Sequence, residues 1–89
     1  MKSAYEIAME RLAQAGGGTK KLSEEQRARI ADIEKRYEAR IAETRVSHEG
    51  QAAAAAPEER AEILARMAEG IRNLEETRDR EKNAVWEEA

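Results

Sequence analysis

A run of five alanines that ends at the only proline most constrains what this chain can fold into. The alanines occupy residues 52–56, Pro57 follows, and charged segments of similar length lie on both sides. Alanine has the highest helix propensity, whereas proline disfavours a helical conformation in the residue before it. The pattern therefore predicts two long helices, over residues 23–55 and 57–88, with a corner between them. In the alternative, the first of these two long helices ends at Gly50, which would leave the alanine run as a loop.

The composition of the chain favours helices over any other secondary structure. Charged residues make up 39 % of the sequence and hydrophobic residues 40 %, and phenylalanine and cysteine are absent. Half of the hydrophobic residues are alanine. This bias is typical of coiled coils and long helices, and no alternating or β-branched run predicts a strand. We expect a single all-α domain of residues 1–89, in which a short N-terminal helix precedes a long antiparallel two-helix coiled-coil hairpin.

A short first helix is predicted over residues 3–15. Ser3 and Glu6 have the spacing of a capping box, and three consecutive glycines open a linker over residues 16–22. A helix of this length is marginal in water by itself, so we expect it to dock through an apolar face. The residues on that face are Tyr5, Ala8, Met9 and Leu12.

The two long segments carry helical seams. Ser23 and Gln26 form a second capping box at the start of the first. In the first long segment, the apolar positions repeat after eleven residues. In the second long segment they have a heptad spacing, and the residues at these positions become polar in its second half. The predicted seam consists of Ile30, Ile33, Tyr37, Ile41, Leu64, Met67, Ile71 and Leu74.

Two registers of the hairpin are compatible with this pattern. A corner near Ala56 places Thr44 opposite Met67 and lets the first helix cover the open end near Trp86. A corner near Ala52 gives better apolar matches but makes the alanines a loop. We favour the corner near Ala56.

The sequence predicts no catalytic site. His48 is the only histidine and lacks the Glu-x-x-His spacing of bundle metal sites, so we expect neither a metal nor a cofactor, and no enzymatic activity. The first residues do not resemble a secretory signal, and no segment has the ~20 apolar residues needed to cross a bilayer, which favours a cytoplasmic protein.

We therefore expect a structural or protein-interaction module that self-associates, as a homo-oligomer, or docks as an accessory subunit on a larger assembly. Its candidate interaction face consists of Tyr5, Met9, Leu12 and Trp86. The alternative is a nucleic-acid- or ribosome-associated factor that uses Lys20, Lys21, Arg27 and Arg29. A net charge of −3 without a basic stripe makes nucleic acid the less favoured partner.

The opening sequence carries a resemblance. Residues 1–6, MKSAYE, residues 8–12, AMERL, and later Thr19 to Leu22 with Glu25 and Gln26, resemble a group of short bacterial proteins of uncharacterised activity. The resemblance implies a short first helix followed by a charged helical hairpin. It also implies that the first helix and the linker make the recognition part and that the hairpin supports them. It implies no activity and brings no catalytic residue.

Overall fold

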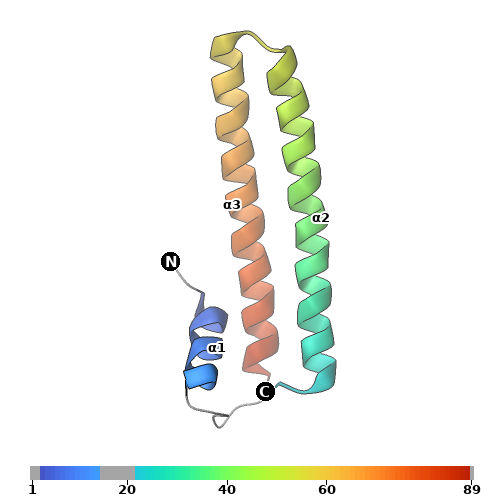
Figure 1. Ribbon diagram of the computed structural model, residues 1–89, viewed down its shortest axis with the longest axis vertical. Coiled ribbons are helices and arrows are strands. Elements are labelled where there is room, and N and C mark those ends of the chain that lie inside the picture. The colour runs from blue at the N-terminus through green and yellow to red at the C-terminus, as the bar shows by residue number, and fades with distance from the viewer. Residues whose placement is uncertain (1–2, 15–21, 89) are drawn as a thin grey trace. The chain divides into compact units, whose positions relative to one another are not determined.

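The computed structural model describes residues 3–14 and 22–88, and all secondary structure in these ranges is helical (Figure 1). The helices are α1 (Ala4–Gln14), α2 (Glu24–Ala54) and α3 (Pro57–Glu87). The bounds of α2 and α3 lie within one residue of the predicted bounds. The predicted end of the first helix at Ala15 and residues 16–21 of the predicted linker lie outside the described residues.

Both predicted capping boxes form hydrogen bonds at the start of a helix. The hydroxyl oxygen of Ser23 accepts the N–H of Gln26 at 3.0 Å, and Gln26 Oε1 accepts the N–H of Ser23 at 2.8 Å. At α1, the hydroxyl oxygen of Ser3 accepts the N–H of Glu6 at 3.2 Å. Because the first N–H groups of a helix have no partner within it, these side chains set where α1 and α2 begin.

The corner between α2 and α3 contains only residues 55 and 56. α2 continues through Ala54, as the predicted corner near Ala56 requires, and α3 begins at Pro57. Arg60 in the first turn of α3 then reaches back to the end of α2, where its Nε donates to the carbonyl of Ala52 at 3.0 Å. Its guanidinium also donates to the carbonyl of Ala55 at 3.3 Å. The last carbonyls of a helix lack intrahelical partners, and here the carbonyl of Ala52 accepts both the Arg60 side chain and, at 3.2 Å, the backbone N–H of Ala55.

The chain divides into two compact units, and α2 and α3 run through both. The first unit is Met1–Glu34 with Arg78–Ala89, and the second is Lys35–Thr77. Whether the chain counts as one domain, as we predicted, stays a prediction. No described helix contains an apolar stretch long enough to cross a membrane.

Buried side chains are few in each unit. The first unit buries Ile30, Ile33 and Val85 to between 3 and 5 % exposure, together with the charged Lys82. The second unit buries Tyr37 and Ala52. Apart from Lys82, these are the only buried side chains among the described residues, and the core is correspondingly thin.

Candidate protein-interaction site

Tyr5 in the first turn of α1 contacts the last turns of α3. Its ring meets the ring of Trp86 edge to face, with centroids 6.3 Å apart and an interplanar angle of 84°. This is a favourable geometry for two aromatic rings because the positive edge of one meets the negative face of the other. The structure thus brings together two of the four residues of the predicted interaction face, which lie 81 positions apart in the sequence.

Lys82 lies beside the same tyrosine. Its Nζ is 4.6 Å from the centroid of the Tyr5 ring and 3.0 Å from Glu34 Oε1. The lysine is 8 % exposed, and a buried ammonium is tolerated only where it is paired. Glu34 supplies the opposite charge from α2, and the aromatic face supplies a second favourable contact. Lys82 therefore connects all three helices within the first unit.

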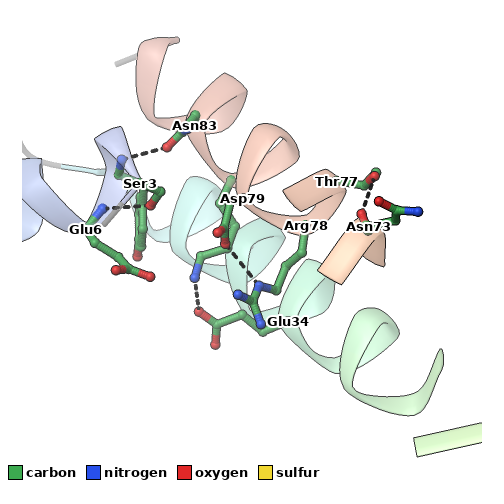
Figure 2. A network of polar contacts seen from close by, with 10 residues as sticks. Ser3, Glu6, Glu34, Asn73, Thr77, Arg78, Asp79 and Asn83 are labelled. Atoms are coloured by element: carbon green, nitrogen blue, oxygen red, sulfur yellow. Dashed lines mark hydrogen bonds and ion pairs between the residues drawn. The ribbon is translucent and has the colours of Figure 1, made fainter. Parts of the chain in front are cut away.

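Asn83 adds a hydrogen bond to the start of α1. Its Oδ1 accepts the backbone N–H of Tyr5 at 2.6 Å. At the same end of α1, Ser3 accepts the N–H of Glu6 (Figure 2). Tyr5 is one of the first residues of α1, so its N–H has no partner inside the helix. A side chain of α3 therefore helps to cap α1, which anchors the beginning of that helix rather than its middle.

The other two residues of the predicted face, Met9 and Leu12, have no described contact of this kind with α3. Met9 is 40 % exposed, and the side chain of Leu12 lies outside the described part of the chain. Ile7 is 39 % exposed and was not in the predicted face, because two residues correspond to about 200° around a helix and place it opposite Tyr5. Exposed apolar side chains thus occur on more than one side of α1.

The predicted seam is buried unevenly. Ile30, Ile33 and Tyr37 are buried, and Ile41, Met67, Ile71 and Leu74 are half-buried. Leu64 does not belong with them, since it is 39 % exposed, whereas the neighbouring Ile63 is half-buried. The reason is geometric: steps of four residues back from Ile71 reach Met67 and then Ile63, so the buried line passes on the Ile63 side of Leu64.

In the second unit, Thr44 of α2 lies close to Gly70 of α3. A Cβ atom added to Gly70 would lie 3.8 Å from the methyl carbon of Thr44. We predicted Met67 opposite Thr44, and Gly70 lies about one turn further along α3. The sequence could not fix this register because alanine and glycine near the corner leave few large side chains to interlock.

Two of the four residues of the alternative nucleic-acid site, Arg27 and Arg29, lie within the described part of the chain. Arg29 forms an ion pair with Glu88, with Nη1 2.8 Å from Oε2 and both side chains about half exposed. Arg27 is exposed, and Lys20 and Lys21 lie outside the described residues. Arg29 is thus paired with a carboxylate, and nucleic-acid binding by these four residues stays a prediction.

His48 has a local partner. Its Nδ1 donates to the carbonyl oxygen of Thr44 at 2.7 Å, one turn earlier in α2. Within the described ranges, no group of three or more histidine, cysteine or acidic side chains is placed to hold a metal ion.

Comparison with known proteins adds no relative. No protein-family model, no curated protein and no solved structure matches this chain. The resemblance of its opening to short bacterial proteins stays an expectation.

Proposed function

We propose that this chain is a protein-interaction module that self-associates, with docking on a larger assembly as the other form of the same function. The observation that carries the proposal is the thin core. The described residues bury only five hydrophobic side chains, one of them an alanine, and leave Ile7, Met9, Val46 and Leu64 exposed. Because buried apolar surface is the main favourable term in folding and association, a second molecule would supply burial that one chain lacks.

We propose α1 and Trp86 as the contacting region. Of the four large hydrophobic residues that are exposed in the described part of the chain, two belong to α1, which has only 11 residues. An isolated helix of this length is marginal in water, so α1 gains most from additional packing. Contact at the beginning of α1 already uses Tyr5 and Trp86, and the neighbouring Met9 extends the same apolar region.

We further propose that α2 and α3 pair as an antiparallel coiled coil that supports this region. In the first unit, Glu34 and Arg29 of α2 pair with Lys82 and Glu88 of α3, so that the chain direction is opposite along the two helices. In the second unit, Arg60 of α3 reaches Ala52 of α2. We also propose a cytoplasmic location.

Sedimentation equilibrium over a hundredfold range of concentration tests the proposal. We expect the apparent mass to rise from that of one chain towards a dimer or a higher oligomer. The double variant Ile7→Ser with Met9→Ser should remain monomeric, because it replaces the exposed apolar side chains of α1. Val46→Ser is the matched control: Val46 is 72 % exposed but lies in α2, so this variant should associate like the original chain.

The outcomes separate the two forms of the function. Loss of association in the control and not in the double variant would contradict the assignment to α1. A chain that stays monomeric at every concentration would contradict self-association, and the partner would then have to be a different protein.

A further inference from the structure

In the described part of α1, Tyr5 makes three different contacts with α3. Tyr5 donates its backbone N–H to Asn83, places its ring face against the Lys82 ammonium and meets the Trp86 ring edge to face. The three residues that receive it lie within about one and a half turns of α3, so they form a small platform: Lys82, Asn83 and Trp86. Ile7 and Met9, further along α1, remain about 40 % exposed.

Lys82 of the platform and the neighbouring turns of α3 also have partners outside α1. Lys82 binds Glu34 of α2, and Arg29 of α2 binds Glu88 of α3. Ile30, Ile33 and Val85 are buried in the same unit. Removal of Tyr5 would therefore leave Lys82 with a carboxylate partner and leave α2 and α3 in contact, so α1 can detach as a unit.

We propose that α1 is a detachable latch, and that the platform it leaves accepts α1 from a second copy of this chain. The proposal rests on the proposed function, since it names the surface through which copies exchange contacts. The platform recognises a helix start by a ring, a free N–H and an aromatic edge, and every copy carries these on its own Tyr5. The partner copy thereby contributes the residue that completes the site.

The test uses the full chain and a synthetic peptide of residues 1–15. Trp86 is the only tryptophan and the peptide has none, so tryptophan fluorescence reports on the platform alone. A Tyr5→Ala chain lacks its own latch, and we expect it to bind the peptide at least about tenfold more tightly than the original chain. In the original chain the tethered α1 competes at high effective concentration. A peptide carrying the same Tyr5→Ala change is the control and should not bind either chain.

Asn83→Ala is the second variant, because it alters the platform and keeps Tyr5. We expect acrylamide to quench Trp86 more strongly in this variant than in the original chain, with unchanged helix content by far-ultraviolet circular dichroism. We also expect it to bind the peptide more weakly than the Tyr5→Ala chain does. This variant decides the question if Tyr5→Ala loses its helix content.

Peptide binding of equal strength to the original and Tyr5→Ala chains, or to neither, would overturn the latch. So would unchanged quenching of Trp86 in Asn83→Ala. These measurements are made at a concentration at which the protein has the mass of one chain. The result for the latch is therefore independent of the result for self-association, and either proposal can fail while the other holds.

Discussion

Arg60 donates from Nε to the carbonyl oxygen of Ala52 across the corner between α2 and α3, at 3.0 Å. The same guanidinium reaches the carbonyl of Ala55. A single side chain therefore donates to two backbone carbonyls at the corner, and the carbonyl of Ala52 also accepts the N–H of Ala55. Alanine side chains cannot do this themselves, because they carry no donor.

Replacement of Arg60 by alanine should lower the free energy of unfolding by about 1–2 kcal/mol, since hydrogen bonds from a charged donor contribute more than neutral ones. Urea unfolding followed by circular dichroism measures the change. Arg66→Ala is the control: Arg66 pairs with Glu62 at 3.7 Å on an exposed surface, where such pairs contribute little. Equal effects in the two variants would contradict the role of Arg60 at the corner.

Gly50→Ala should stabilise the chain by roughly 1 kcal/mol, because glycine costs about that much relative to alanine inside a helix. Nothing lies within 4 Å of the position that the new Cβ would occupy. Gly70→Ala should also stabilise, since its new Cβ would meet the Thr44 methyl at an ordinary contact distance of 3.8 Å. Thermal unfolding checks both variants, and a lower melting temperature in Gly50→Ala would show that the helix does not continue through this position.

Glu34→Gln should destabilise the chain by about 1–2 kcal/mol, because it leaves the buried Lys82 ammonium without its carboxylate. The loss is smaller than for a fully buried pair, since Glu34 itself is 52 % exposed. Lys82→Met removes the charge but keeps an apolar side chain of similar length, so we expect a change within about 1 kcal/mol. Combining both changes should recover most of the loss caused by Glu34→Gln alone. Urea unfolding of the three variants tests this, and a double variant no more stable than Glu34→Gln would refute the pairing.

Ile33→Ala should lower the free energy of unfolding more than Leu64→Ala does, although both positions belong to the predicted seam. Ile33 is 5 % exposed, and truncation of a buried isoleucine costs about 2–5 kcal/mol. Leu64 is 39 % exposed and loses less buried area, so we expect about 1 kcal/mol or less. Denaturant midpoints of the two variants measure the difference, and similar losses would place Leu64 in the core after all.

Features that depend on neighbouring residues were predictable. The starts of α1 and α2 follow from Ser3 with Glu6 and Ser23 with Gln26, and the helical alanine run before Pro57 follows from propensity. Each depends on residues at most four positions apart, so periodicity and capping chemistry suffice. The burial of Ile30, Ile33 and Tyr37 agrees with their spacing for the same reason.

Features that depend on how one helix packs against another could not be predicted from the sequence. No local signal distinguishes Lys82 from the exposed Lys35, and Lys82 is buried where Glu34 and the Tyr5 ring converge on it. The reach of Arg60 across the corner and the exposure of Leu64 depend on rotation and register, which small side chains leave open.

The sequence by itself determined that this chain is helical, where its helices begin and where the alanine run must turn. Helix propensity, capping and proline geometry act within a few residues and need no other part of the molecule. The tertiary structure alone decided that Tyr5 meets Trp86 and Asn83, and that a lysine rather than a hydrophobic residue lies beneath them. Those contacts join residues nearly the whole chain apart, and only the packing of one helix against another brings them within reach.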